Sequence, residues 1–303
     1  MKILEIGQEK LTFKGHNDWV NAITITPDGR TVISGSRDKT IKAWDLETTE
    51  IKFILSGHSD WVNAIALTPD GRTVISGSDD KAIKIWNLET GEVESTLTGH
   101  NRWVKAIAIT PDGKTVISGS RDGTIKVWDL ETRKEKFTFK GHSGWVRAIA
   151  VTPDGKTVIS SSWDSNTIKT WDLETGQEKF TLSGHSGWVR AIAVTPDGKT
   201  VISGLGDNTI KTWDLETGQE KLTLSGHSDW VNTVTITPDG KTVISGSDDK
   251  TIKTWDLTTG NKVATFTGES PILAVASDGL TIVAGEASGT LHFLRLQENN
   301  MIA

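Results

Sequence analysis

The chain has 303 residues, a net charge of −6 and no cysteine. The lack of cysteine excludes disulfides, cysteine metal sites and thiol nucleophiles, and we expect a cytoplasmic location because a reducing compartment requires no disulfides. The acidic balance gives no overall attraction to nucleic acid. No stretch approaches the ~20 consecutive apolar residues of a membrane-spanning helix. Neither nucleic acid nor a membrane is therefore expected as a partner.

The first predicted strand falls within residues 4–13, LEIGQEKLTF, which nearly repeat LETGQEKLTL at residues 215–224. In the later copy these residues end one strand and form the next. The chain therefore begins in the middle of a repeating unit.

The first complete unit contains four predicted strands, WVNAITIT (19–26), TVISGS (31–36), TIKAWDL (40–46) and IKFIL (51–55). Short runs rich in β-branched residues are typical of strands. The first two are joined by Pro27-Asp28-Gly29, a tight turn in which glycine accepts a positive φ. No segment has a sustained 3.6-residue period, so we expect helix to be nearly absent.

The unit recurs along the chain at steps of 42 or 43 residues, and twenty residues from Gly141 return letter for letter from Gly184. The repeats start near Gly15, Gly57, Gly99, Gly141, Gly184, Gly226 and, in a degenerate copy, Gly268. A period of about 40–45 residues with four strands is typical of a β-propeller.

The last predicted strand is TLHFLRL (290–296), a third strand without a fourth. We predict that residues 4–13 supply the missing strand and close the ring, which removes the open sheet edges. The expected fold is all-β, a seven-bladed propeller of four-stranded antiparallel blades, in a single domain over 1–303. We expect a monomer.

The combination of Gly-His, Pro-Asp-Gly and Ser-Gly-Ser-x-Asp-x-Thr-Ile-Lys-x-Trp-Asp resembles the WD-repeat β-propeller family. Five units end in the Trp-Asp pair that gives the family its name, at Trp44, Trp128, Trp171, Trp213 and Trp255. The resemblance implies a non-catalytic scaffold that binds a protein or peptide. The near-identical blades and the ending GTLHFLRL are also similar to the C-terminal propellers of bacterial NACHT or NB-ARC signalling ATPases, which implies a sensor.

The resemblance further implies a buried His-Ser-Asp-Trp hydrogen-bonded tetrad in each of six blades. The predicted tetrads are His16-Ser34-Asp38-Trp44, His58-Ser76-Asp80-Trp86, His100-Ser118-Asp122-Trp128, His142-Ser160-Asp164-Trp171, His185-Ser203-Asp207-Trp213 and His227-Ser245-Asp249-Trp255. A constellation that recurs in six places indicates architecture rather than a catalytic triad. We therefore predict no enzymatic activity, no metal and no cofactor.

The seventh blade has no tetrad, because Glu269, Ala284, Ser288 and Leu294 occupy the corresponding positions. His292 is the one histidine outside the Gly-His pairs. We expect it to pack or to face solvent rather than to bind metal.

Candidate partner-binding residues lie in the loops that the family places on the top face. They are a predicted ring of indoles and a basic arc with one further indole: Trp19, Trp61, Trp103, Trp145, Trp188 and Trp230, with Arg102, Lys105, Arg121, Arg147, Arg190 and Trp163. Exposed tryptophans are frequent binding hot spots, although each could instead pack on its neighbouring blade. The charges suggest a basic half of this face opposite an acidic half.

Two further readings of function remain open. The indoles and the basic arc could hold a small ligand or single-stranded nucleic acid by stacking. Alternatively, the chain could be a recently amplified or engineered repeat protein with no specialised partner.

Overall fold

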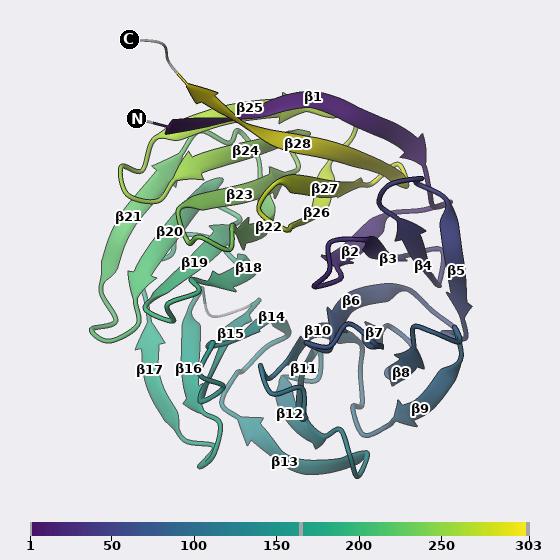
Figure 1. Ribbon diagram of the computed structural model, residues 1–303. Coiled ribbons are helices and arrows are strands. Elements are labelled where there is room, and N and C mark those ends of the chain that lie inside the picture. Colours follow the sequence, from purple (N-terminus) through teal and green to yellow (C-terminus); the bar gives the residue numbers. More distant parts are fainter. Residues whose placement is uncertain (1, 164–165, 301–303) are drawn as a thin grey trace.

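A computed structural model describes residues 2–163 and 166–300, with side chains described for 12–163 and 166–296. Within these ranges the chain forms 28 strands in seven four-stranded antiparallel sheets and no helix. The sheets stand as blades around a central axis (Figure 1). The prediction of an all-β, seven-bladed propeller is confirmed.

Each of the first three blades uses four consecutive strands, ordered from the axis outward. Blade one contains β2 (Val20–Ile25), β3 (Thr31–Ser36), β4 (Thr40–Asp45) and β5 (Ile51–Ser56). Blade two contains β6 (Val62–Leu67), β7 (Thr73–Ser78), β8 (Ile83–Asn87) and β9 (Val93–Leu97). Blade three contains β10 (Val104–Ile109), β11 (Thr115–Ser120), β12 (Thr124–Asp129) and β13 (Lys134–Lys140).

The next three blades repeat this order. Blade four contains β14 (Val146–Val151), β15 (Thr157–Ser162), β16 (Ile168–Asp172) and β17 (Glu178–Leu182). Blade five contains β18 (Val189–Val194), β19 (Thr200–Leu205), β20 (Thr209–Asp214) and β21 (Glu220–Ser225). Blade six contains β22 (Val231–Ile236), β23 (Thr242–Ser247), β24 (Thr251–Asp256) and β25 (Lys262–Thr267).

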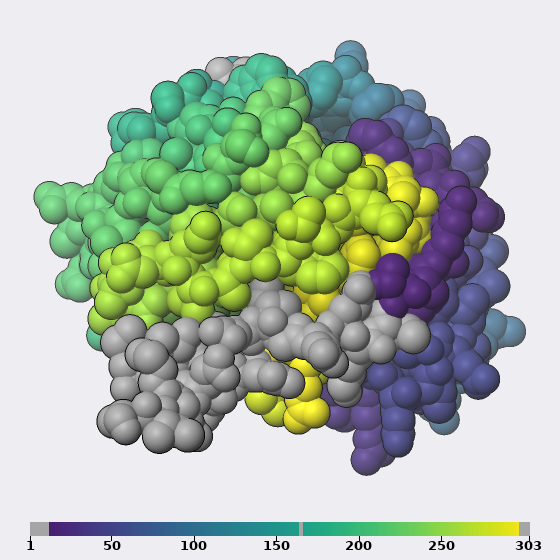
Figure 2. Space-filling model, turned by 90° about the horizontal axis from the view of Figure 1, so that it is seen from above, coloured from purple at the N-terminus to yellow at the C-terminus, as the bar shows by residue number. Residues whose placement is uncertain are grey.

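Blade seven is built from both ends of the chain. It joins β26 (Ile272–Ser277), β27 (Thr281–Glu286) and β28 (Thr290–Asn300) to β1 (Lys2–Lys14) as its outermost strand. Strands β1 and β28 run antiparallel from Lys14 opposite Thr290 to Lys2 opposite Asn300. They lie side by side in Figure 1, and Figure 2 shows the last blade between blade six and the N-terminal residues. This pairing closes the ring.

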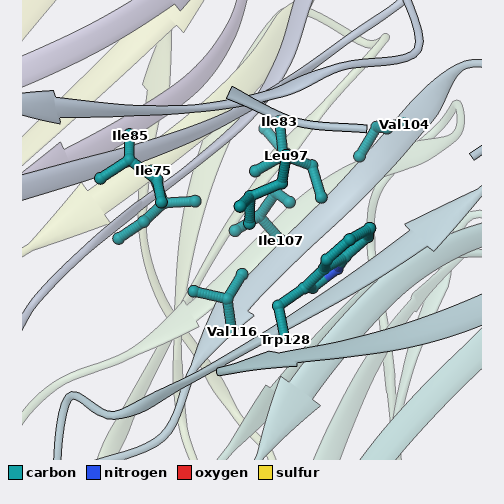
Figure 3. Close-up of a cluster of buried hydrophobic side chains, with 9 residues drawn as sticks. Ile75, Ile83, Ile85, Leu97, Val104, Ile107, Val116 and Trp128 are labelled. Carbon is teal, nitrogen blue, oxygen red and sulfur yellow. The ribbon is translucent and has the colours of Figure 1, made fainter. Parts of the chain in front are cut away.

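The core lies between the blades rather than within any one of them. Seven buried clusters each join two consecutive blades. In the cluster of Figure 3, Ile75, Ile83 and Leu97 of blade two meet Val104 and Trp128 of blade three. Burial of such apolar surface contributes about 25 cal/mol per Å². No blade can bury its faces alone, so the repeats stabilise one another around the ring.

A glycine on the second strand of most blades marks the closest approach between neighbours. A Cβ atom on Gly119 would lie 2.5 Å from Val146 Cγ1 of the next blade, and the same holds for Gly77 and Val104 Cγ1. Only a residue without a side chain fits there. Blade four differs: Ser161 occupies this position and donates a hydrogen bond to the Val189 carbonyl at 3.1 Å.

The first strand of every blade carries a β-bulge at its second residue. In blade three the register shifts between Val104 and Ala106, so Lys105 is the extra residue. The equivalent shift occurs in the other six blades. A bulge re-aims a side chain relative to the ladder. Here it defines seven positions around the axis.

Candidate functional site

Four of the predicted tetrads are complete. In blade one, Trp44 Nε1 donates to Ser34 Oγ at 2.8 Å, Ser34 Oγ lies 2.7 Å from His16 Nε2, and His16 Nδ1 lies 2.8 Å from Asp38 Oδ2. Each group in the tetrad forms a hydrogen bond with the next one, so the buried polar atoms all have partners. The blades with all three contacts are one, two, three and six.

The tetrad carboxylates are held in their charged form. Burial by itself raises the pKa of Asp80, but hydrogen bonds from His58, Ala82 and Ser59 outweigh it and lower the pKa to about 2. The same balance lowers the pKa of Asp249 to about 2. These aspartates accept bonds from two loops at once and thereby fix the loops to each other.

Blade five has an incomplete tetrad. Ser203 Oγ is 3.4 Å from His185 Nε2, and Asp207 accepts a hydrogen bond from Ser186 Oγ at 2.6 Å instead of one from His185. His185 Nδ1 is buried without a partner. Burial lowers the pKa of His185 to about 4, which keeps the ring neutral.

The cause of this departure is Leu205, which is fully buried. Its counterpart in blade one, Ser36, accepts a hydrogen bond from the Asp38 backbone at 3.0 Å and so holds that loop in place. Leucine cannot do this. In blade four, His142 lies 2.7 Å from Ser160, while Asp164 lies outside the described residues.

Blade seven replaces the tetrad with a different buried network, which the sequence analysis did not foresee. Glu286 is fully buried and accepts hydrogen bonds from His292 Nε2 at 2.8 Å, Ser288 Oγ at 2.8 Å and the Glu269 backbone at 2.8 Å. Thr12 Oγ1 on β1 lies 2.9 Å from His292 Nδ1. His292 is therefore buried and hydrogen-bonded, and it links β1, the strand that closes the ring, to β27 of the last blade. Glu286 stands where five of the other six blades have a serine, and this difference in the sequence could have indicated the network.

We define the top face by the loops that these networks hold together, namely 15–19 and 36–40 in blade one and their equivalents. The opposite face carries the Pro-Asp-Gly turns. Leu46 N donates there to the Arg30 carbonyl at 2.8 Å, which joins two turns of the lower face.

The predicted ring of indoles is present on the top face, but it is not a freely exposed collar. Trp19 and Trp230 are 37% and 36% exposed, whereas the other four are half-buried. In blades one, three and four the residue just before the tetrad aspartate lies between the indole of its own blade and that of the next, which covers part of both. Its backbone is anchored, as where Arg37 N donates to the Trp19 carbonyl at 2.9 Å.

Two arginines and a tryptophan lie between neighbouring indoles in this way. The Arg37 guanidinium lies 3.4 Å from the Trp19 ring centre and 4.1 Å from that of Trp61. Arg121 lies likewise 4.3 Å from Trp103 and 3.6 Å from Trp145. These are cation–π distances.

The third gap contains an indole. Trp163 stacks on Trp188 with ring centres 4.1 Å apart and lies 5.6 Å from Trp145. In blade five the interleaving residue is Gly206, which leaves room for Trp188 to meet Trp230 directly, edge to face, at 5.8 Å. The rim of the top face therefore consists of two runs of side chains in contact, Trp19-Arg37-Trp61 and Trp103-Arg121-Trp145-Trp163-Trp188-Trp230.

The bulge residues line the mouth of the central channel. They are Asn21, Asn63, Lys105, Arg147, Arg190, Asn232 and Leu273. All seven border a hollow of about 150 Å³, together with Trp19 and Arg37. Sequence reasoning singled out three of these positions for their charge, but it did not recognise the bulge that aims them all at the axis.

Two of the cations at the mouth form ion pairs with a carboxylate of a neighbouring blade. Lys105 Nζ lies 2.8 Å from Asp79 Oδ1, and Arg190 Nη1 lies 3.4 Å from Asp248 Oδ2. Burial lowers the pKa of Lys105 to about 8 despite its contact with Asp79. The two ion pairs lie at the two borders between the expected basic half, blades three to five, and the expected acidic half, blades six, one and two. Arg102 stands apart from them, on an exposed loop.

Three larger hollows, of about 430 to 740 Å³, lie between neighbouring blades on the lower face. They repeat one pattern of a Pro-Asp-Gly turn, a lysine and an aromatic side chain, as with Pro27, Lys52 and Phe53. Among the described residues no group of three His, Cys, Asp or Glu could hold a metal. No helix in the described ranges is long and apolar enough to cross a membrane.

The fold and these networks define a closed propeller that carries its distinctive side chains at one channel mouth. The family model described as "WD domain, G-beta repeat" matches residues 7–45, 49–87, 91–129, 133–172, 176–214 and 218–256. The chain belongs to the WD-repeat family.

Individual relatives match over single repeats. Segments of the chain are similar to nuclear distribution protein PAC1 of Candida tropicalis (59% identical over 34 residues, 11% of this chain and 7% of that protein) and to the transcriptional repressor tup12 of Schizosaccharomyces pombe (51% over 35 residues, 12% and 6%). Another is similar to the probable E3 ubiquitin ligase complex SCF subunit scon-2 of Neurospora crassa (48% over 44 residues, 14% and 7%). The match thus spans less than a tenth of each relative.

Proposed function

We propose that this chain is a non-catalytic interaction scaffold that binds a protein or peptide on its top face. The observation that carries the proposal is the rim of interleaved indoles and guanidiniums around a charged channel mouth. WD-repeat propellers generally bind protein partners, and the name of one relative describes a subunit of a complex.

The rim suits a docking surface because its aromatic groups are held in place before binding. Trp19 and Trp230 present the most exposed indoles, and each is already packed against an arginine, Arg37 or Arg190. A partner that covers them loses little side-chain entropy, so more of the contact energy is retained as affinity. Tryptophan and arginine are also the residues most enriched at binding hot spots.

Single-stranded nucleic acid fits this rim less well than a protein does. A base needs a free aromatic face on which to stack, and indole faces here are covered by Arg37, Arg121 and Trp163. The net charge of −6 also opposes a polyanion.

We further propose a monomer in the cytoplasm, in keeping with the absence of cysteine. The near-identity of the blades favours a sensor role like that of the C-terminal propellers of bacterial NACHT or NB-ARC ATPases. The relatives reported above are fungal proteins, so this kinship is a proposal resting on the blade sequences alone.

The test is partner capture from a lysate of the organism that encodes the chain, with wild type and two double variants. Trp19→Ala with Trp230→Ala alters the top face. Ile54→Ala with Phe180→Ala is the matched control, because these side chains are 52% and 44% exposed on outer strands. All three proteins are first compared by thermal unfolding.

A partner retained by wild type and by the control, but lost by the top-face variant, is the expected result. Equal retention by the top-face variant, or selective loss in the control, would move the docking surface elsewhere.

A further inference from the structure

Among the described residues, Arg147 is the one cation at the channel mouth with no carboxylate, amide or aromatic ring to hold it. It is the bulge residue of β14 and borders the central hollow. Among the described residues its guanidinium makes no hydrogen bond, ion pair or ring contact, whereas Lys105 and Arg190 each have an acidic partner. A partly buried charge without a partner costs free energy.

Lys105 and Arg190 show which chemical group pairs with a cation at the channel mouth. Asp79 is held by Lys105 at 2.8 Å and by the Asn63 amide at 2.7 Å. Asp248 is held by Arg190 at 3.4 Å and by the Asn232 amide at 2.6 Å. In both cases the mouth of the channel binds a carboxylate between a cation and an amide.

The repeats show why no such carboxylate is described beside Arg147. Asp79 and Asp248 occupy the position just before the tetrad aspartate. The equivalent positions nearest to Arg147 are taken by Arg121, Trp163 and Gly206 in blades three, four and five. None of these side chains can accept a hydrogen bond from a guanidinium.

The charge next to Arg147 itself also favours an anion. Arg37, Lys105, Arg147 and Arg190 border the hollow. Asp18, Asp79, Asp229 and Asp248 lie near Arg37, Lys105 and Arg190, whereas no carboxylate among the described residues contacts Arg147. Burial, followed by repulsion from Arg190 and Arg37, lowers the pKa of Arg147 to about 10, so it stays charged at neutral pH. The hollow of about 150 Å³ admits a group the size of a carboxylate, not a folded segment.

We propose that the channel mouth is a carboxylate-binding subsite in which an aspartate or glutamate side chain of an acidic partner pairs with Arg147. This inference rests on the proposed function, because it names the partner's chemistry at the same face. The acidic side chain completes at blade four the pairing that Asp79 and Asp248 provide elsewhere.

The first test uses a fluorescent acetyl-hexaglutamate peptide as the probe, read by anisotropy at low ionic strength, with hexaglutamine as its uncharged control. Wild type binds hexaglutamate and not hexaglutamine. Arg147→Met weakens binding about 10-fold or more, as expected for the loss of a charge-assisted hydrogen bond. Lys134→Met removes the same charge from an exposed outer strand and changes affinity less than about 2-fold, because an exposed charge so far away is screened.

The second test introduces a carboxylate beside Arg147 by substitution in the protein itself. Arg121→Asp places an acid beside Arg147, as Asp79 stands beside Lys105, and is expected to abolish hexaglutamate binding. Arg121→Asn removes the same guanidinium between Trp103 and Trp145 but adds no charge, so the difference between the two variants measures the effect of the added acid alone. Arg121→Asp is expected to bind hexaglutamate about 10-fold or more weakly than Arg121→Asn, and equal binding by the two would contradict the subsite. Thermal unfolding of both variants first checks that each protein is folded under the conditions of the binding assay.

The subsite proposal is overturned if wild type does not bind hexaglutamate, if Arg147→Met binds as tightly as wild type, or if Lys134→Met loses as much affinity. These outcomes are separate from the partner-capture result. A partner that the Trp19→Ala, Trp230→Ala variant no longer captures, but that Arg147→Met still captures, would support the scaffold function without this subsite. Hexaglutamate binding that needs Arg147, with no partner captured, would support the subsite without the scaffold function.

Discussion

His292 on β28 donates to Glu286 on β27 across 2.8 Å, in the blade whose sequence lacks the Gly-His pair and the tetrad aspartate. Because His292 also contacts Thr12 on β1, this pair takes the place of the tetrad and connects the two ends of the chain. Burial raises the pKa of Glu286, but hydrogen bonds led by that from His292 outweigh it and lower the pKa to about 2. The carboxylate is thus an integral part of ring closure.

Replacing Glu286 with glutamine is predicted to destabilise the fold by about 2–3 kcal/mol, since a buried acceptor of several charge-assisted bonds becomes a partial donor. Glu269→Gln makes the same chemical change on an exposed side chain and costs less than about 0.5 kcal/mol. Urea unfolding of both variants measures the difference. Equal stability of the two would mean that the Glu286 network does not support closure.

A complete tetrad is predicted to contribute more to the free energy of unfolding than the incomplete tetrad of blade five. Asp38→Asn removes the charge that holds His16, the Asn17 backbone and Thr40, and costs about 2–3 kcal/mol. Asp207→Asn touches no histidine and costs less than about 1 kcal/mol. Chemical denaturation of the two matched variants checks this. A larger loss for Asp207→Asn would contradict the geometry of blade five.

Stability is predicted to fall as the pH drops from 6.5 toward 4, in part through His185. Its pKa is lowered by burial from 6.5 to about 4 in the folded state, so the unfolded chain binds a proton there that the folded chain does not. His227, whose pKa burial also lowers, acts in the same direction.

The variant His185→Gln should therefore show a shallower loss of unfolding free energy between pH 6.5 and pH 4 than wild type. Denaturant titrations at several pH values measure the slope. His58→Gln serves as the comparison, since His58 has its aspartate partner at 2.7 Å. An unchanged slope in His185→Gln would show that His185 is not the group responsible.

The contact between neighbouring blades is predicted to exclude even a methyl group at Gly119. Gly119→Ala places a Cβ 2.5 Å from Val146 Cγ1 and is expected to cost about 1–3 kcal/mol through overpacking. Ser161→Gly, at the same position in blade four, loses only the bond to the Val189 carbonyl and costs about 1 kcal/mol. Thermal unfolding compares them. A neutral Gly119→Ala would mean that the blades can separate locally.

The blades and the closure were predictable because they depend on local signals. Pro27-Asp28-Gly29 specifies a turn between two short β-branched runs, and each such hairpin recurs at a constant spacing. The likeness of residues 4–13 to residues 215–224 sufficed to predict β1 as the outer strand of the last blade.

The rim and the channel mouth were less predictable because their contacts join different blades. Arg37 covers Trp61 only once blades one and two have packed together. Lys105 meets Asp79 only once blades two and three have packed and the bulge has turned Lys105 inward. The failure of Asp207 to reach His185 follows from Leu205, a single replacement two residues away. Such effects depend on packing in three dimensions, which a repeat pattern does not encode.

The most direct measurement of the central claim is hydrogen–deuterium exchange on the chain with and without its captured partner. The scaffold account predicts that the partner slows exchange in the top-face loops, residues 15–19 and 36–40 and their counterparts, and leaves the turns at 27–30 and their counterparts unchanged. Protection confined to those Pro-Asp-Gly turns, beside the hollows of the lower face, would contradict it.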